Sequence, residues 1–305
     1  TLGVTLNGGP AMATQITTAF VEQYSANVMH LSQQKGSRLR SCVDSETVTG
    51  KNAFFEQIGT VSARERTTRH QDTPQMDTPH ARRRVSLVDY DFADLIDNED
   101  RIRMLIDPTS PYVAAAANAM GRAIDSAIIA AADGTAFTGV SGSTSTSYLA
   151  SMTVDVQVGV SPAADTGLNV GKLRAAKENL DANEVDPDAK RYVVLNAKQL
   201  SNLLAETEVT SSDFNTVKAL VQGEVNEFLG FNFVRTELIG VDGNSDHKVL
   251  YFSQPGLKLA IGSNPVARIS ERADKNHATQ VFYSMSIGAT RMEEKQVGYI
   301  ECDPS

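Results

Sequence analysis

The chain has 305 residues, of which 41% are hydrophobic and 21% are charged, and its formal net charge is -9 at pH 7. This length allows one large domain or two modest ones with buried cores, and the ordinary composition excludes a disordered or fibrous protein. The acidic balance argues against a protein whose main task is to bind nucleic acid, because phosphate binding relies on surplus Lys and Arg.

The two cysteines, Cys42 and Cys302, lie near opposite ends of the chain, without the spacing of a zinc site or a disulfide framework. We therefore expect a reducing compartment. No apolar run approaches the roughly 20 residues needed to span a bilayer, and the first residues lack the order of a signal peptide. The sequence thus predicts a protein that is made and used in aqueous cytoplasm, with no membrane contact.

The N-terminal part of the chain predicts an amphipathic helix between about residues 14 and 34, ended near Gly36. Its apolar stripe consists of Ile16, Phe20, Tyr24, Val28 and Leu31. Either the body of this chain or a neighbouring subunit must cover such a stripe, and both arrangements stay open. For the second arrangement, Phe20 and Tyr24 are our candidate contacts between subunits.

Residues 44 to 96 predict a long charged hairpin arm. A period of two between Asp44 and Arg66 indicates one strand, and residues 83–92 indicate the strand that returns. Between them, residues 67–81 contain two prolines and almost no large apolar side chain, which is typical of an exposed loop tip. Because an isolated hairpin is marginally stable in water, the arm should be held by another surface.

The charges of the arm fall into two adjacent blocks, which we take as candidate contacts between subunits. The basic block with its one glutamate comprises Arg64, Glu65, Arg66, Arg69, Arg82, Arg83 and Arg84, and the acidic block includes Asp89, Asp91 and Asp94. We expect the arginines to be solvated in the isolated chain and paired only in an assembly. A solvated charged surface is the competing interpretation for any single residue.

A helix of roughly 33 Å is predicted at residues 110–134, where one apolar stripe ends at Gly134. Residues 134–167 are rich in Gly, Ser and Thr, and "GVSGSTSTS" at 139–147 predicts a flexible loop, with a short strand at 152–160. Beyond them a compact α/β domain is expected. Its expected helices lie at 168–183, 197–206 and 212–221, and its expected strands at 191–195, 231–236, 248–252 and 257–261. Two last strands, at 280–289 and 296–301, are expected to return to the sheet beneath the long helix.

No catalytic, cofactor-binding or metal site can be recognised in the sequence. The histidines at positions 30, 70, 80, 247 and 277 stand apart, and the loose group His70, Asp72, Asp77 and His80 lies in a loop that contains prolines. The sequence contains neither a phosphate-binding Gly-Lys-Ser/Thr loop nor a serine nucleophile elbow. Acidic pairs such as Glu293 and Glu294 are interpreted as solvated surface groups. We therefore expect a structural protein and no enzyme.

The order of these parts resembles the major capsid protein of tailed bacteriophages, which has the Hong Kong 97-like fold. The segments that carry the resemblance are "DPTSPYVAAAANAMGRAIDSAIIAAADG" at 107–134, "FLGFNFVRT" at 228–236 and "GATRMEEKQVGYIECD" at 288–303. The resemblance implies an α+β fold of four parts. These are an N-terminal arm at 1–43, an E-loop at 44–96, a P-domain with a long spine helix at 97–165 and 270–305, and an α/β A-domain at 166–269.

The resemblance also implies a self-assembling subunit of the virion capsid. Such subunits form pentamers and hexamers, assemble in the cytoplasm of the bacterial host, and enclose double-stranded DNA without sequence-specific contact. A scaffolding protein and a portal are implied partners, with a decoration or cement protein as an optional addition. Two alternatives stay open: an encapsulin-type compartment of the same fold, and an α/β enzyme that uses residues 166–269.

Overall fold

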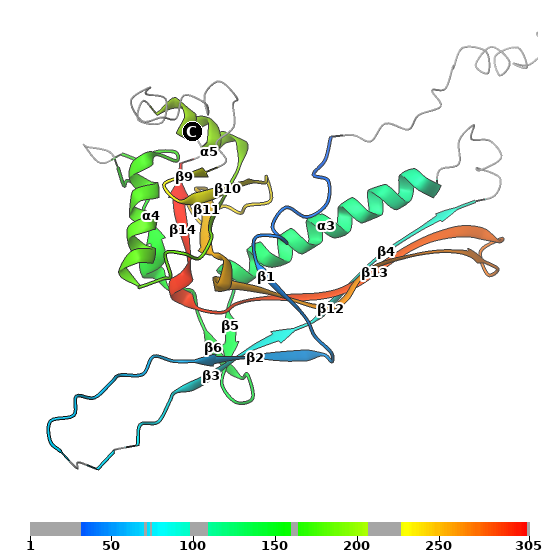
Figure 1. Ribbon diagram of the computed structural model, residues 1–305. Helices are drawn as coiled ribbons and strands as arrows, with labels where there is room; N and C mark the ends of the chain where they lie inside the picture. Colours follow the sequence, from blue (N-terminus) through cyan, green and yellow to red (C-terminus); the bar gives the residue numbers. More distant parts are fainter. Residues whose placement is uncertain are drawn as a thin grey trace, which may run out of the picture.

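The computed structural model describes residues 32–69, 72–73, 75–97, 109–159, 164–206 and 227–303, with the backbone alone at 109–111. These residues form three β-sheets that meet near one end of a long helix, and a hairpin arm projects from the body (Figure 1). The helix predicted at 212–221 lies outside the described residues, as does most of the one predicted at 14–34 with Phe20 and Tyr24. None of the described helices is long and apolar enough to cross a membrane.

The longest sheet has four strands and lies against helix α3 (Thr109–Asp133), which confirms the helix predicted at 110–134. Its order is β1 (Asp44–Thr47), β12 (Leu257–Arg272), β13 (Ala278–Arg291) and β4 (Val88–Ile96). Met120, Ile124 and Ile128 recur at helical spacing, so they form one face of α3. They are buried in one cluster with Met285 and Ile287 of β13.

Three strand predictions in this region were wrong. The single strand expected between Asp44 and Arg66 is divided into β1, which pairs with β12, and a strand at 52–58 in the arm, and residues 59–66 form no strand. The returning strand expected at residues 83–92 is divided at Leu87: β3 (His80–Ser86) stays in the arm, whereas β4 pairs with β13 along its whole length. The strand expected at 257–261 continues to Arg272, past two register irregularities. Both divisions were missed because a period of two shows that a segment is extended but does not show its partner. The length of β12 was missed because its second half is exposed and lacks the alternation of buried and exposed residues.

A six-stranded sheet forms the α/β part of the molecule. Its order is β7 (Thr153–Val154), β14 (Val297–Cys302), β11 (His247–Ser253), β8 (Arg191–Leu195), β10 (Phe231–Arg235) and β9 (Glu227–Phe228). Helices α4 (Val170–Ala182) and α5 (Ala197–Ala205) pack against it through a shared apolar core. Each begins at an asparagine, Asn169 or Asn196, whose side chain accepts a hydrogen bond from a backbone N–H of the first turn. The helices and strands predicted between residues 168 and 252 are confirmed where the structure describes them.

Strand β14 was expected beneath the long helix, and this prediction was wrong. It pairs with β11 and β7 in the six-stranded sheet instead. Val297 and Tyr299 belong to the cluster that α3 covers, whereas Ile300 and Cys302 belong to the core beside α4. A strand buried on both faces has no polar side that would show its sheet, so its sequence could not reveal which one it joins.

The third sheet forms the base of the arm, in the order β2 (Asn52–Ile58), β3, β5 (Ala136–Thr138) and β6 (Thr144–Thr146). The prediction of a flexible loop at 139–147 was therefore wrong for residues 144–146, which form β6. Gly139 and Gly142 supply the positive φ angles of the β5–β6 turn. A Cβ on Gly142 would lie 2.6 Å from the Cβ of Arg84, so this turn packs directly on the arm. The short helices η1 (Ala150–Met152), η3 (Gln254–Gly256) and η4 (Glu294–Gln296) join the sheets.

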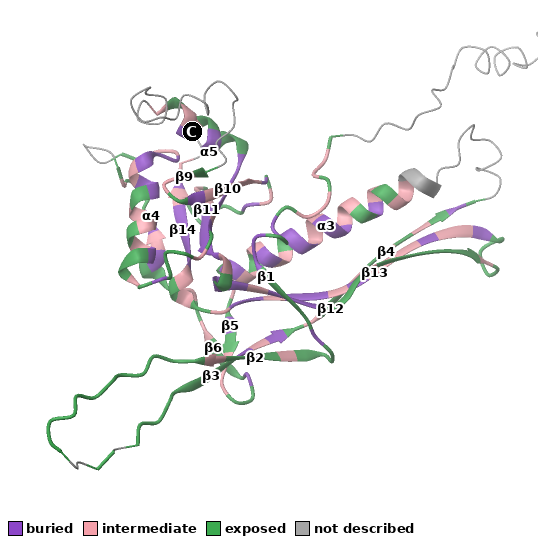
Figure 2. Cartoon of the chain, viewed as in Figure 1, coloured by how far each residue is buried: buried purple, intermediate pink, exposed green. Residues whose placement is uncertain are grey.

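Residues 33–39, which we call the strap, cross α3 before the chain enters β1. The backbone of Gly36 lies directly on Gly121 of α3. One turn later the fully buried carboxylate of Asp125 accepts hydrogen bonds from the side chains of Gln34 and Ser37 and from the backbone N–H groups of residues 38 and 39. A desolvated carboxylate needs several donors, and the strap supplies them. Leu39, at the end of the strap, is fully buried in the apolar cluster of Met120 and Ile124, and Figure 2 shows buried residues on α3.

Substituting Gly121 by Ala tests the backbone contact between the strap and α3. In an open helix this change stabilises a protein by about 1 kcal/mol. Here the added Cβ would lie 2.3 Å from the carbonyl carbon of Gly36, which is backbone and cannot rotate away. We expect Gly121→Ala to lower the free energy of unfolding by roughly 1–3 kcal/mol in urea denaturation.

The matched control is Gly243→Ala, because no atom lies within 4 Å of its added Cβ. We expect this control to stay within about 0.5 kcal/mol of the parent. A Gly121→Ala variant as stable as the parent would show that the strap does not press on the helix.

Candidate functional site: the arm and its base

The arm leaves the body as the β2–β3 hairpin and continues into a tip without regular secondary structure in its described residues (Figure 1). A hydrogen bond from Gly59 N–H to Pro79 O, 2.8 Å long, marks the boundary between the hairpin and the tip. Every described residue from Ile58 to Pro79 is exposed, as Figure 2 shows. The prediction of an exposed tip is confirmed, and no surface of the described chain covers it.

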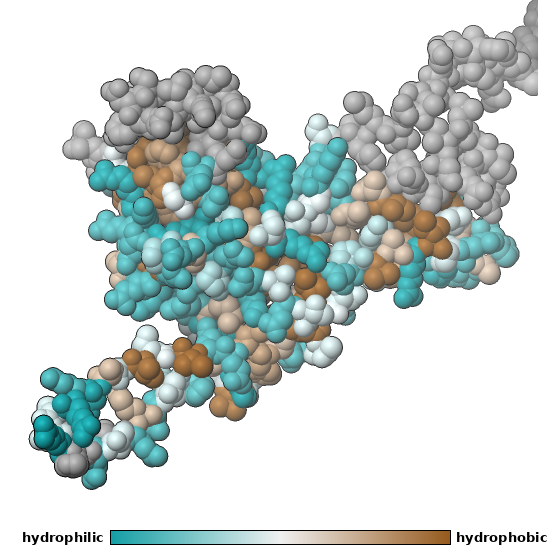
Figure 3. Space-filling view, in the orientation of Figure 1, coloured by the Kyte–Doolittle hydropathy of each residue, from teal (hydrophilic) through white to brown (hydrophobic). Residues whose placement is uncertain are grey.

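The hairpin has two different faces, because successive side chains of a strand point to opposite sides. Phe55, Val85 and Arg83 are buried against the body, and Arg83 lies opposite Phe55 in the register. Phe54 and Ile58 lie on the outward face and are exposed. With Val61 and Met76 they give the arm a row of exposed apolar groups, and Figure 3 shows apolar groups along the arm near its base.

Arg82 and Arg84 share the outward face of the hairpin. The guanidinium of Arg82 lies 2.8 Å from the carboxylate of Glu56 across the two strands, and both side chains are largely exposed. The guanidinium of Arg84 lies 4.7 Å from the centre of the Phe137 ring on β5, in a cation–π contact. Arg82 therefore stays accessible to another molecule, whereas Arg84 is half-buried beneath the β5–β6 turn.

Arg83 was expected to be solvated in the isolated chain, and this expectation was wrong. The residue is only 6% exposed. Nη2 lies 2.6 Å from both carboxylate oxygens of Glu294, and Nε donates to Met292 O at 2.8 Å. The interpretation of Glu294 as a solvated surface group was wrong for the same reason. Alternation along β3 turns the middle arginine toward the body, where burial requires a partner of opposite charge.

Arg291, at the end of β13, completes this junction and is fully buried. Its Nη1 donates to Ala132 O at 2.7 Å and to Gly134 O at 3.0 Å, so the guanidinium caps the C-terminus of α3, where the helix dipole favours a cation. Its Nε lies 3.7 Å from Oε1 of Glu294. Burial lowers the pKa of Arg291, and the carboxylate of Glu294 opposes this effect. We call Arg83, Arg291 and Glu294 the junction triad.

The acidic block lies on β4 and thus on the edge of the longest sheet. Tyr90 and Phe92 pack toward α3, so Asp89 and Asp91 point to the opposite face, where they are exposed. Asp94 lies on the same face as Tyr90 and Phe92. Within the described residues, no ion pair joins this block to the arginines of the arm. Arg64, Glu65, Arg66 and Arg69 all lie in the exposed tip.

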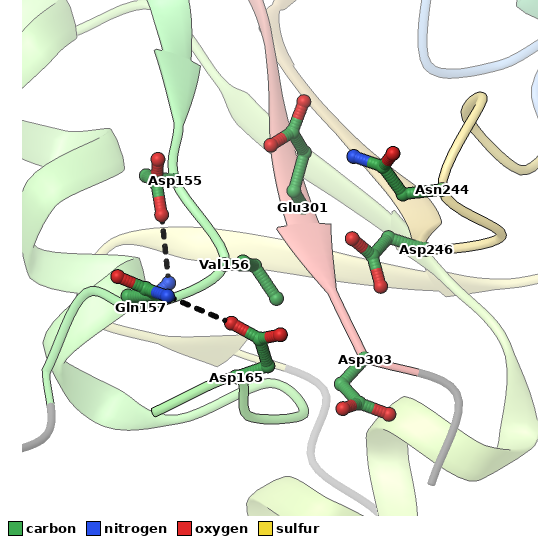
Figure 4. A pocket seen from close by; sticks show the side chains of 8 residues that line it. All are labelled: Asp155, Val156, Gln157, Asp165, Asn244, Asp246, Glu301 and Asp303. Carbon is green, nitrogen blue, oxygen red and sulfur yellow. Dashed lines mark hydrogen bonds between the residues drawn. The ribbon is translucent and has the colours of Figure 1, made fainter. Parts of the chain in front are cut away.

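A second feature, which the sequence did not reveal, is an acidic hollow of about 530 Å³ at the end of β14 (Figure 4). Its acidic side chains are Asp155, Asp165, Asp246, Glu301 and Asp303. Gln157 Nε2 donates to Asp165 at 3.0 Å on one side of the hollow. Burial raises the pKa of Asp246 and of Glu301, and neighbouring carboxylates, Asp242 foremost, raise both further. Among the described residues, no group of His, Cys, Asp and Glu is arranged to hold a metal ion.

Known capsid structures share this architecture. The capsid of the cyanophage P-SCSP1u superposes with a TM-score of 0.72 at 18% identity and covers 99% of this chain and 98% of its own. The capsid of Ralstonia phage GP4 superposes with a TM-score of 0.70 at 12% identity and covers 100% of both chains. The head structure of Helicobacter pylori bacteriophage KHP40 superposes with a TM-score of 0.70 at 10% identity and covers 99% of both chains. The chain therefore has the Hong Kong 97-like α+β fold of tailed-phage capsids.

The family of the chain follows from its sequence. The sequence profile of the family described as phage capsid protein matches residues 16–304, so the chain belongs to that family. A comparison with curated proteins finds none that matches. The resemblance stated from the sequence is thus confirmed, and so is a structural role in the virion capsid. Neither the family nor these structures favour an encapsulin-type compartment or an enzyme.

Reversing single arginines tests the division of the two hairpin faces. Arg83→Glu places a carboxylate against Glu294 and leaves Arg291 with a changed partner, so we expect a loss of roughly 3–5 kcal/mol in the free energy of unfolding. Arg82→Glu loses only an exposed pair and should cost less than about 1 kcal/mol. Urea unfolding of the two variants beside the parent measures both values. Equal costs would mean that the buried pair does not hold the base of the arm.

Proposed function

We propose that this phage capsid protein assembles through its arm into pentamers and hexamers, which close an icosahedral shell around double-stranded DNA. Capsid structures of the same fold support assembly into oligomeric shells. The observation that carries the proposal is the arm itself, whose described tip is exposed throughout. No described residue of this chain covers the tip, so the tip gains a binding surface when a neighbouring copy receives it. In the terms of the fold, the arm corresponds to the E-loop.

The exposed apolar groups of the arm attract a neighbouring subunit, but they do not determine which of its surfaces is bound. Phe54 and Ile58 are exposed on the outward face of the hairpin, and Val61 and Met76 are exposed in the tip. Full burial of one such side chain contributes about 1.5–3 kcal/mol, so a neighbour that covers several of them gains a substantial contact. Closed symmetry repeats this contact at every subunit, so a shell does not need a strong single interface.

Charge selects which surface of the neighbour receives the arm. The tip contributes Arg64, Arg66 and Arg69, and the acidic block of β4 contributes Asp89 and Asp91 on an open sheet face. Complementary patches steer association and disfavour wrong pairings. Arg82 and Arg84 belong to the same contact, whereas Arg83 acts within its own subunit. Phe20 and Tyr24 of the N-terminal segment, with Glu65 and Asp94, complete the set of proposed contacts.

The remaining partners follow from the role as a container. A net charge of -9 disfavours tight binding of the genome, so the enclosed DNA is held without sequence-specific contact. We propose a scaffolding protein and a portal as partners during assembly in the bacterial cytoplasm, with a decoration or cement protein on the finished shell. The four-part division into residues 1–43, 44–96, 97–165 with 270–305, and 166–269 belongs to this proposal.

Negative-stain microscopy and sedimentation of the full chain, made together with its scaffolding protein, test the proposal. We expect large closed particles, and a preparation that contains only monomers and dimers would contradict it. In the same assay the variant Arg64→Glu/Arg66→Glu/Arg69→Glu should fold normally by circular dichroism and fail to form particles, because its tip repels the acidic face.

The matched control for the tip is Arg64→Lys/Arg66→Lys/Arg69→Lys, which keeps the charge and changes the shape. We expect this control to assemble, and raised salt to weaken its assembly and that of the parent. Normal particles from the glutamate variant would show that charge at the tip does not select the contact.

A further inference from the structure

A row of cations lies where the strap crosses α3 (Figure 1). Lys35, Arg38 and Arg40 follow one another closely in the sequence and are all exposed, and Arg122 of α3 is half-buried beside the strap. Among the described residues, no ion pair joins any of these four cations to a carboxylate. We call Lys35, Arg38, Arg40 and Arg122 the strap patch. It is a local exception in a chain whose formal net charge is -9.

Neutral acceptors hold the guanidinium groups of the strap patch in place. Arg38 donates to a backbone carbonyl at the end of β10, and Nη2 of Arg40 donates to Asn264 Oδ1 at 2.9 Å. Nη1 of Arg122 donates to Gln33 Oε1 at 2.8 Å. None of these acceptors carries a charge, so the positive charges stay uncompensated. Each guanidinium has five N–H donors in a fixed fork, so donors remain for an external anion.

Two carboxylates beside the strap patch are already engaged by other groups. Asp125 is fully buried under the strap, where four donors of the strap use its two oxygens. Glu237 lines the hollow between the strap and α5, and its Oε1 accepts the N–H of Ala197 at 2.8 Å. The chain ahead of the strap brings little negative charge, because Glu22 is the single acidic residue among positions 1–31. The patch therefore remains available to an anion from outside the chain.

The composition of the strap surface indicates which class of anion it fits. Its accessible side chains are those of Gln, Lys, Ser and Arg, whereas its one large apolar residue, Leu39, is fully buried. A stable protein–protein contact has an apolar or aromatic centre, which residues 33–41 do not offer. Arg, Lys, Ser and Gln side chains are the groups that contact the phosphates of nucleic acids. Since these residues include no aromatic ring, the strap has no platform on which bases could stack.

We propose that the strap patch contacts the phosphates of double-stranded DNA, and that this face of the subunit is the inner face of the shell. The contact reads no sequence, because it involves charges and no base edges. A single basic surface on an acidic subunit gives the DNA one place to rest, while the other surfaces repel it. The inward placement rests on the proposed function, whereas phosphate binding by the patch does not.

Fluorescence anisotropy of the unassembled full chain with a labelled DNA duplex of random sequence tests the phosphate contact. The variant Lys35→Gln/Arg38→Gln/Arg40→Gln removes three charges from the patch. We expect its affinity at low salt to fall at least about tenfold below that of the parent. The slope of log K against log salt should fall in magnitude by roughly 3, because each phosphate contact contributes about 0.9 to it. A parent chain that binds no DNA at low salt, or a variant with the affinity of the parent, overturns the inference.

The matched control is Arg174→Gln/Lys190→Gln/Lys198→Gln, which removes the same charge from exposed positions of the α/β part. We expect its affinity to stay within about twofold of the parent, because salt screens charges that do not touch the DNA. An equal loss in the control would show that net charge alone governs binding. Poly-glutamate serves as the second ligand, and binding as tight as that of DNA would assign the patch to an acidic protein segment instead.

The charge-neutral variant must fold for the comparison to hold, which circular dichroism checks. If the triple variant fails to fold, Lys35→Gln/Arg40→Gln replaces it, since it keeps the hydrogen bond from Arg38 to the end of β10. Unchanged affinity in this double variant overturns the inference as well.

Closed particles test the inward placement. Lys35→Cys puts a thiol in the patch, while the native Cys42 and Cys302 are buried. We expect a maleimide attached to a large polyethylene glycol to label this thiol only after the particles are disrupted, because the reagent is too bulky to enter a closed shell. Labelling of intact particles overturns the placement. A chain that binds DNA but forms no particles contradicts the proposed function alone, and particles whose subunits bind no DNA contradict this inference alone.

Discussion

The guanidinium of Arg291 is the contact on which the arrangement of the three sheets depends. It lies at the end of β13 in the longest sheet, donates to the last carbonyls of α3, and reaches Thr146 O at the end of β6 in the sheet of the arm. Through Glu294 it also contacts the turn that leads into the six-stranded sheet. A buried ion pair contributes little net stability, since desolvation offsets its attraction. Its donors have fixed directions, however, so Arg291 determines where these ends can meet.

The exposed arm would be a liability in a protein that remained a monomer. Exposed apolar groups such as Ile58 and Val61 invite association, and the open edge of β2 can pair with another strand. A shell subunit uses the same tendency, provided that only the correct neighbour is accepted. The carboxylates of β4 serve this end as well, because charged residues on an edge strand discourage pairing with any strand that arrives by chance. In the proposed assembly, the apolar groups that attract a neighbour lie on the sheet of the arm, and the charges that select the contact lie on the edge of the longest sheet.

Elements whose apolar pattern differs between faces could be predicted from the sequence. Helix α3, the alternating elements from α4 to β11 and the exposed tip of the arm all have such patterns, and their bounds were close to those observed. The pairing partner of a strand could not be predicted where two strands share one apolar pattern or where a strand has none. The period of two runs through β3 and β4 although they join different sheets, and β14 is buried on both faces. The β5–β6 hairpin pairs with the edge of β3 through its backbone, which requires no apolar side chains. Its Gly, Ser and Thr residues therefore give no apolar pattern from which strands could be predicted.

The three consecutive arginines of β3 show which features of the candidate site could have been predicted from the sequence. In a strand, residues 82 and 84 share one face and residue 83 takes the other. Since Phe55 and Val85 are the buried positions of this hairpin, alternation alone places Arg83 with them. A buried arginine requires a carboxylate, but its identity could not be predicted, because Glu294 lies more than 200 positions away along the chain. The strand period therefore divides one basic run into one arginine that is buried against the body of its own subunit and two that lie on the opposite face of the hairpin.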